Sequence, residues 1–236
     1  MTGNNCKLIY DLPFCSDVAY AVPANSSSTV SDLVSFYDSN ALSLYKIFNS
    51  SIQQISCNTT DSAKYSLVST CDNCSDSYKT WLCAVTIPRC EDLSAPVSVG
   101  AAIMPRNMVN ASVAELQTAG INASYAQRSW VNSSRNPLID QSLAPGPYKE
   151  LLPCVNLCYN LARTCPTVMS FSCPRQMSLL SRSYGIYNRQ LASTGTWTCN
   201  FLGHDPDMPV ASRAALGAGA WFPLLIMIGL LHLVFW

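Results

Sequence analysis

Four cysteines within twenty residues, Cys71, Cys74, Cys83 and Cys90, are the side chains of this sequence whose type and spacing could do chemistry. Four thiolates can hold a structural Zn²⁺, and the pair Cys71-x2-Cys74 has the form of half a zinc site. The other interpretation is disulfide formation, in which each sulfur has a partner elsewhere in the chain. The chain has twelve cysteines, an even number, which is compatible with both interpretations.

The surroundings of the cysteines favour disulfides. Asn-x-Ser/Thr sequences accept N-linked glycans only in the secretory pathway, where disulfides form. The chain has seven such acceptors, namely Asn25, Asn49, Asn58, Asn73, Asn110, Asn122 and Asn132. The Cys74-x8-Cys83 interval also does not suit a zinc site, so we predict disulfides, no metal and no cofactor.

Composition and residue types exclude several classes of function. The 14 basic and 14 acidic side chains cancel, which leaves no electrostatic footprint for nucleic acid. The two histidines, His204 and His232, lie in a linker and in an apolar tail, where neither is placed to act as a base for a nucleophile. The sequence has no phosphate-binding loop. We therefore predict no catalytic residue, no enzymatic activity and no small-molecule substrate.

Helical periodicity indicates the elements that position the cysteines. Apolar residues recur at helical intervals from Val30 to Ile55, behind a Thr29-x-x-Asp32 capping signal. Residues 75–85 form a second predicted helix, which Pro88 ends. In a third, Cys154, Cys158 and Cys165 lie on one stripe that must face the core.

The chain divides into three predicted parts. Residues 1–203 form a cysteine-rich domain with a loop-rich, glycosylated insertion at 91–147, in which Trp130 is a candidate contact for a partner. Residues 204–219 form a linker. Residues 220–236 form an apolar tail of about 25 Å as a helix, short of the roughly 30 Å hydrocarbon core.

The two ends of the sequence carry expectations about targeting. Small residues, a short spacer and an apolar run match a glycosylphosphatidylinositol (GPI) attachment signal, with Ser212 as the candidate attachment residue and Ala211 and Ala214 as alternatives. A short membrane helix or a buried helix remains an alternative for the tail. The start, MTGNNC, lacks the charged and apolar regions of an export signal, so we interpret it as truncated.

The ordered cysteine spacings resemble a known domain family. Cys6-x8-Cys15, Cys74-x8-Cys83-x6-Cys90 and Cys154-x3-Cys158-x6-Cys165, followed by Cys173 and Cys199, are similar to the Frizzled-type cysteine-rich domain. The stretches YKTWLCAVTIPRC, GPYKELLPCVNLC and CDNC narrow the resemblance to the fungal stretch-activated calcium-channel regulatory subunits (the mating-induced-death family). Animal sodium-leak channel auxiliary factors are relatives of that family. The resemblance covers about residues 6 to 203.

The resemblance implies a fold and a pairing of cysteines. The expected fold class is mainly α and disulfide-rich, a Frizzled-like cysteine-rich domain with a long glycosylated insertion and a C-terminal hydrophobic tail. Carried over by position, the pairs are Cys6–Cys90, Cys15–Cys83, Cys74–Cys165, Cys154–Cys199 and Cys158–Cys173. Cys57 and Cys71 are left over and would form a sixth bridge, and an exchange of Cys71 with Cys74 stays open.

The resemblance also implies a function. We expect a non-enzymatic, extracellular auxiliary subunit of a plasma-membrane calcium channel, which docks on a pore-forming four-repeat cation-channel subunit and supports stretch- or stress-activated calcium influx. It would lie on the extracellular face of the plasma membrane, held there by its C-terminal anchor. Two alternatives are a Frizzled-like receptor module for a lipid or secreted ligand and a self-assembling stretch-activated channel.

Overall fold

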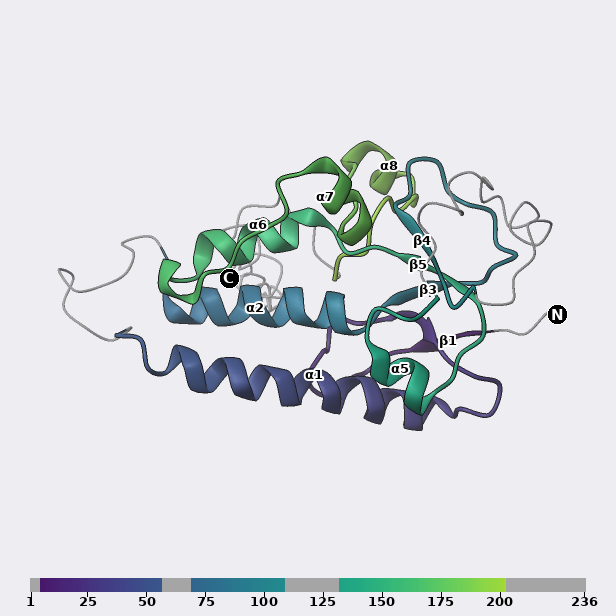
Figure 1. Cartoon of the computed structure of the whole chain (residues 1–236), viewed down its shortest axis with the longest axis horizontal. Helices are drawn as coiled ribbons and strands as arrows, with labels where there is room; N and C mark the ends of the chain where they lie inside the picture. Colours follow the sequence, from purple (N-terminus) through teal and green to yellow (C-terminus); the bar gives the residue numbers. More distant parts are fainter. Residues whose placement is uncertain (1–4, 57–68, 109–131, 203–236) are drawn as a thin grey trace, which may run out of the picture. The chain divides into compact units, whose positions relative to one another are not determined.

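The computed structural model describes residues 5–56, 69–108 and 132–202 of the chain. All of these residues belong to one compact unit, Met1–Gly203. Its elements follow in the order of a β-hairpin, two long helices, and a three-stranded sheet that is completed after an intervening stretch of chain, with shorter helices toward the end (Figure 1).

The first long helix, α1 (Val30–Ile52), begins at a capping box. Oγ1 of Thr29 accepts a hydrogen bond from the backbone N of Asp32 at 3.1 Å, and Oδ2 of Asp32 accepts one from the backbone N of Thr29 at 3.4 Å. The box satisfies N–H groups that the first helical turn leaves unpaired. Its apolar side faces the interior through Leu33, Tyr37, Ala41, Phe48 and Ile52, which are buried.

The second long helix, α2 (Cys71–Thr86), contains three of the four clustered cysteines. A second capping box starts it, formed by Thr70 and Asn73. α2 packs against α1 on one side and against α6 (Val155–Thr164) on the other (Figure 1). The three helices therefore lie side by side, with α2 in the middle.

Two small antiparallel sheets complete the unit. β1 (Cys6–Ile9) pairs with β2 (Tyr20–Pro23) as a two-stranded hairpin. The second sheet has the order β3-β5-β4, built from β3 (Arg89–Glu91), β4 (Ile103–Arg106) and β5 (Tyr148–Leu151). β5 lies between the other two strands, and all four of its residues are buried.

Short helical segments connect and cover these elements. They are α5 (Pro137–Ser142), the 3-10 turn η1 (Thr167–Met169), α7 (Met177–Ser183) and α8 (Arg189–Ser193). Within the described residues, no helix combines the length and the apolarity needed to cross a bilayer.

The mainly α fold class expected from the sequence is wrong. The described residues form six helices and two antiparallel sheets, so the unit is mixed α/β as well as disulfide-rich. Strands of three or four residues are too short to show alternation in a sequence. Part of the predicted loop-rich insertion, 91–147, supplies β4 and α5, and the stretch before the late helix supplies β5.

Aromatic side chains fill the space between the long helices. The rings of Phe48 from α1 and Tyr78 from α2 stack with their centroids 3.7 Å apart and their planes 5° from parallel. Phe171 and Trp81 lie against Tyr78 at centroid distances of 5.8 and 5.7 Å. Rings packed in this way bury large apolar areas, so this cluster stabilises the packing of the helices against one another.

Candidate functional site

Disulfides connect the four-cysteine segment, residues 71–90, to other parts of the unit. Cys74 and Cys83 project from α2 and Cys90 lies in β3. The structure joins the five pairs that the resemblance implies, Cys6–Cys90, Cys15–Cys83, Cys74–Cys165, Cys154–Cys199 and Cys158–Cys173. Two of these tie the N-terminal residues to the segment, and Cys74–Cys165 ties α2 to the end of α6.

These bridges also decide what the cysteine sulfurs can do. Cys74, Cys83 and Cys90 are each bonded to another sulfur, so they cannot act as thiolate ligands of zinc. Cys71 is disulfide-bonded as well, whereas its predicted partner Cys57 lies outside the described residues. The sulfurs therefore hold the scaffold, and the chemistry of the unit must be sought in other side chains.

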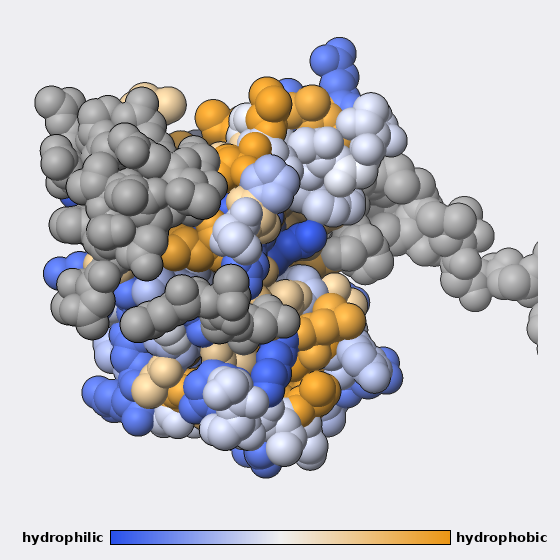
Figure 2. Space-filling view, turned by 90° about the vertical axis from the view of Figure 1, so that its right-hand side faces the viewer, coloured by the Kyte–Doolittle hydropathy of each residue, from blue (hydrophilic) through white to orange (hydrophobic). Residues whose placement is uncertain are grey.

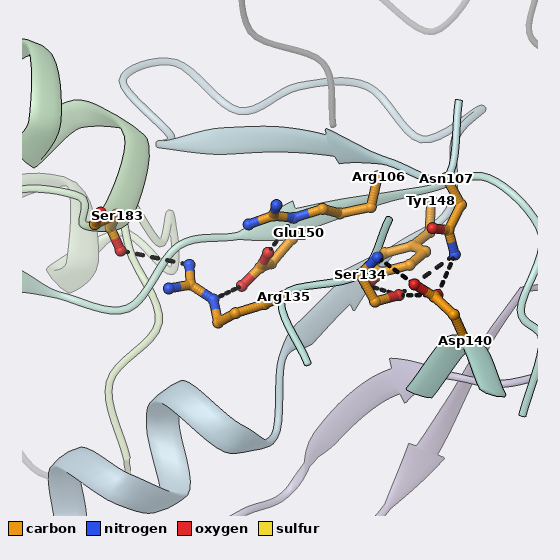
Figure 3. Close-up of polar contacts among 8 residues, drawn as sticks. All are labelled: Arg106, Asn107, Ser134, Arg135, Asp140, Tyr148, Glu150 and Ser183. Atoms are coloured by element: carbon orange, nitrogen blue, oxygen red, sulfur yellow. Dashed lines mark hydrogen bonds and ion pairs between the residues drawn. The ribbon is translucent and has the colours of Figure 1, made fainter. Parts of the chain in front are cut away.

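A buried ion cluster lies on the three-stranded sheet (Figure 3). The Glu150 carboxylate, 1% exposed, accepts a hydrogen bond from Nε of Arg106 at 2.6 Å and one from Nε of Arg135 at 2.7 Å. Nη2 of Arg135 donates to the backbone carbonyl of Ser183, at the end of α7. One carboxylate of the central strand thus holds β4, the 132–135 stretch and, through Arg135, α7.

Beside the ion cluster, a second polar network surrounds Ser134 (Figure 3). The Asp140 carboxylate accepts hydrogen bonds from the Ser134 backbone N at 2.8 Å, from Ser134 Oγ at 2.6 Å and from Asn107 Nδ2 at 3.0 Å. The Tyr148 hydroxyl donates to Ser134 Oγ at 3.0 Å. Burial raises the pKa of Tyr148, and the negative Glu150 raises it further.

Together the two networks form a polar platform, defined by Arg106, Asn107, Ser134, Arg135, Asp140, Tyr148 and Glu150. Arg106 and Asn107 lie just before the segment 109–131, and Ser134 and Arg135 lie just after it. Asn107 Nδ2 donates to Ser134 Oγ at 3.3 Å, and Arg106 and Arg135 share the Glu150 carboxylate, so the described residues on the two sides of 109–131 are held together. The platform is the most extensive buried polar network among the described residues.

Lys149 points its charge to the opposite side of β5 from Glu150. Its Nζ donates to the backbone carbonyl of Ala95. Burial lowers the pKa of Lys149, whereas the neighbouring Glu91 and Asp92 carboxylates raise it. The central strand therefore anchors the chain on both of its faces.

The predicted glycan acceptors fall into two groups. Asn25, Asn49, Asn73 and Asn132 are described, and none of them is buried. The side chain of Asn25 is engaged, because its Nδ2 donates to the carbonyl of Leu143 at 2.7 Å and its Oδ1 accepts from Ser27 and Ser28. Asn132 is exposed, although Ser134, the hydroxyl residue of its acceptor sequence, is buried in the platform.

Several predicted positions lie outside the described residues. They are Asn58, Asn110, Asn122, the candidate partner contact Trp130, the candidate attachment residue Ser212 and the apolar tail 220–236. The two histidines, His204 and His232, lie there as well. The described residues contain no cluster of three or more His, Cys, Asp or Glu side chains that could hold a metal ion.

The polar platform could not be found from the sequence. Arg106 and Glu150 are 44 positions apart, and no motif connects the two residues. The one signal was the pair Lys149-Glu150 between apolar residues in the stretch YKELL, which is unusual for solvated charges. A buried charge is tolerated only when paired, so this pair could have indicated hidden partners.

Comparisons with known proteins identify similar chains. Residues 1–205 match the model of a protein family described as a stretch-activated Ca²⁺-permeable channel component. The stretch-activated cation channel yam8 of Schizosaccharomyces pombe is 42% identical over 203 residues, which are 86% of this chain and 36% of that protein. The stretch-activated cation channel MID1 of Saccharomyces cerevisiae is 35% identical over 210 residues, 87% of this chain and 33% of that protein.

The chain thus spans about a third of the length of these curated relatives. A MID1 channel of Cryptococcus neoformans is 26% identical over 207 residues. No solved structure matches the fold.

Proposed function

This chain belongs to the family of stretch-activated Ca²⁺-permeable channel components, and from that premise we propose that it is a non-enzymatic, extracellular auxiliary subunit that docks on a pore-forming, four-repeat cation-channel subunit. In this role it would support calcium influx under stretch or stress at the plasma membrane. It would act by binding an assembled or openable state of the channel better than other states.

The observation that carries the proposal is the disulfide framework of a unit that matches channel components. The described residues contain five bridges, and four of them join residues at least 45 positions apart. Bridges of this kind persist in oxidising compartments, which supports an extracellular position. The acceptor sequence at the exposed Asn132 is consistent with passage through the secretory pathway.

The apolar run near the C-terminal end of the sequence suits membrane attachment better than a pore lining. Its long apolar run, 220–236, contains His232 and no other strongly polar side chain. One such run offers no polar lining for an ion path. We therefore assign to this run the task of holding the unit at the membrane. Release of the protein from cells by a phosphatidylinositol-specific phospholipase would support a GPI anchor, and retention would favour a membrane helix.

The alternative of a lipid-binding receptor module requires an open apolar channel between the α1 helix and the late helix, α6. In the structure, Phe48, Tyr78 and Phe171 fill the space between the helices with stacked and tilted rings. An acyl chain would have to displace this cluster. The docking role needs no such rearrangement, so we prefer it.

Co-purification tests the proposal. An epitope-tagged, glycosylated form of the protein, expressed with the pore subunit, should recover that subunit from gently solubilised membranes. A membrane glycoprotein of the same compartment, tagged in the same way, serves as the control. Recovery of no more pore subunit than the control recovers would refute the docking role.

A further inference from the structure

The charges of the unit are distributed unevenly along the chain. Residues 151–202 contain four arginines and no lysine, aspartate or glutamate, although the whole chain has no net charge. All four arginines are exposed, namely Arg163, Arg175, Arg182 and Arg189. The exposed carboxylates of the described residues lie on the N-terminal half, at Asp11, Asp17, Asp32, Asp72 and Asp76.

These arginines belong to one part of the fold. Arg163 lies in the last turn of α6, Arg182 in the last turn of α7, and Arg189 at the start of α8. α7 packs on α6, because its Leu180 and the following Tyr184 share a buried cluster with Val155 and Cys158. Figure 1 shows α6, α7 and α8 on the side of α2 that faces away from α1. We refer to the exposed side chains of residues 159–189 as the α6–α8 face.

Large apolar side chains are exposed among the arginines of the α6–α8 face. The upper edge in Figure 2, which is the edge of α7 and α8 in Figure 1, shows apolar side chains beside hydrophilic ones. The exposed apolar residues of the face are Tyr159, Val168, Met177, Leu179 and Ile186, with exposures between 51% and 75%. Arginine, methionine and tyrosine are enriched in protein interfaces, whereas lysine and acidic residues are depleted there. A face kept only for solubility would be expected to carry lysine and glutamate instead.

The framework holds this face in place before any partner binds. α7 and α8 have seven and five residues, too few to be stable as isolated helices. The Cys158–Cys173 bridge fixes the chain before α7 to α6, and Nε1 of Trp81 in α2 donates to the Tyr184 hydroxyl at 2.9 Å. Because the face is ordered before a partner binds, less conformational entropy is lost on association.

We propose that the α6–α8 face binds an acidic protein surface on the extracellular side of the pore-forming subunit. The inference rests on the proposed docking function and adds the surface and the chemistry of its partner. Cation-permeable channels concentrate aspartate and glutamate around their ion path, which provides a complementary charge. Complementary charges steer association and fix its register, and the apolar residues supply the buried core of the contact.

The test reverses charges on the face and measures recovery of the pore subunit from gently solubilised membranes. The pair Arg175→Glu/Arg182→Glu should lower recovery by about tenfold, because like charges would then oppose each other across the contact. Lys46→Glu is the control, since Lys46 is an exposed cation on α1, away from the face. The control should recover the pore subunit within about twofold of the wild type, and wild-type recovery should fall as salt screens the contact.

The outcomes separate this inference from the function on which it rests. Equal recovery by wild type and the Arg175/Arg182 variant would overturn the α6–α8 face and leave the docking role intact. Failure of the wild-type protein itself to recover the pore subunit would overturn both. If the Glu variant is not exported, Arg175→Gln/Arg182→Gln replaces it, and an unchanged recovery again counts against the face.

A membrane surface is the competing ligand for a basic face. Vesicles with and without phosphatidylserine, mixed with the full-length protein, distinguish it. Binding to the anionic vesicles that the Arg175/Arg182 reversal abolishes, while co-purification stays unchanged, would assign the face to lipid and overturn the proposal.

Discussion

Replacement of Glu150 by glutamine tests whether the polar platform stabilises the unit. The substitution keeps the size and shape of the side chain and removes its negative charge. Arg106 and Arg135, whose side chains are 7% and 22% exposed, would then share a buried site without a counter-charge. One of the two guanidinium groups would also face the new amide NH₂ instead of an acceptor oxygen.

The expected cost follows from the burial of these groups. Removing one member of a buried ion cluster costs about 3–5 kcal/mol, because the remaining charges stay desolvated and uncompensated. For a unit of this size, each kcal/mol lowers the midpoint of thermal unfolding, Tm, by about 2–4 °C, so Glu150→Gln should lower Tm by about 6 to 20 °C. Arg135→Gln should cost less than Glu150→Gln, since Arg135 is the more exposed partner and its loss leaves Glu150 paired with Arg106.

Thermal unfolding of the glycosylated protein, followed by near-ultraviolet circular dichroism with the disulfides intact, measures this cost. Asp76→Asn removes one carboxylate charge from an exposed position on α2 and should change the free energy of unfolding by no more than about 0.5 kcal/mol. If the Tm of Glu150→Gln is as close to the wild type as that of Asp76→Asn, the charge of Glu150 does not stabilise the unit.

Three further predictions concern the platform and the bridges. Asn132→Gln and Ser134→Ala should each remove one glycan from the mass of the protein. Only Ser134→Ala should also destabilise the unit, by about 1–3 kcal/mol, because it leaves the Asp140 carboxylate with fewer hydrogen-bond donors. Equal stability of the two variants would contradict this. Burial raises the pKa of Tyr148, so the stabilising effect of the neutral Tyr148 side chain is complete below about pH 10 and is lost as pH rises further. The stability of the protein should therefore fall above that pH, and it should fall less in Tyr148→Phe. Alkaline unfolding followed by phenolate absorbance measures this difference. Replacing both cysteines of the Cys74–Cys165 bridge by serine should cost about 4–5 kcal/mol, because this bridge closes a loop of 91 positions. The same replacement at the Cys158–Cys173 bridge, whose loop spans 15 positions, should cost about 3 kcal/mol. Denaturant titrations that reverse this order would refute the entropic explanation.

The long helices could be predicted from the sequence because their signals are strong and local. α1 has several turns of apolar periodicity and a capping box within four residues of its start. α2 was predicted over 75–85, and the structure extends it to Cys71–Thr86. The earlier start comes from Thr70 and Asn73, whose reciprocal capping bonds begin the helix about one turn before residue 75.

The three-stranded sheet could not be predicted because its signals are neither long nor local. β5 pairs with β3 and β4, which precede it by more than 40 residues. Its sequence, YKEL, places two charged residues inside the unit, which contradicts the usual rule that charges lie outside. Only the positions of Arg106, Arg135 and Ala95 in space explain how those charges are satisfied.

The disulfide framework, unlike the polar platform, could be predicted from the sequence through the resemblance. The cysteine spacings carried a pairing through resemblance, because each sulfur needs one partner and the order of cysteines is a compact signal. The sequence signal for the α6–α8 face is weaker: residues 151–202 contain no aspartate, glutamate or lysine. That absence acquires meaning only when the fold places α6, α7 and α8 together on one side of α2.

Stretch-activated calcium current distinguishes an auxiliary role beside a separate pore from a channel formed by this protein alone. The measurement compares stretch-activated calcium current in cells that express the pore-forming subunit alone, this protein alone, or both, with surface delivery of each checked. We predict current with both proteins, little with the pore subunit alone, and none with this protein alone. Calcium current from the purified protein reconstituted by itself into a bilayer would contradict this prediction.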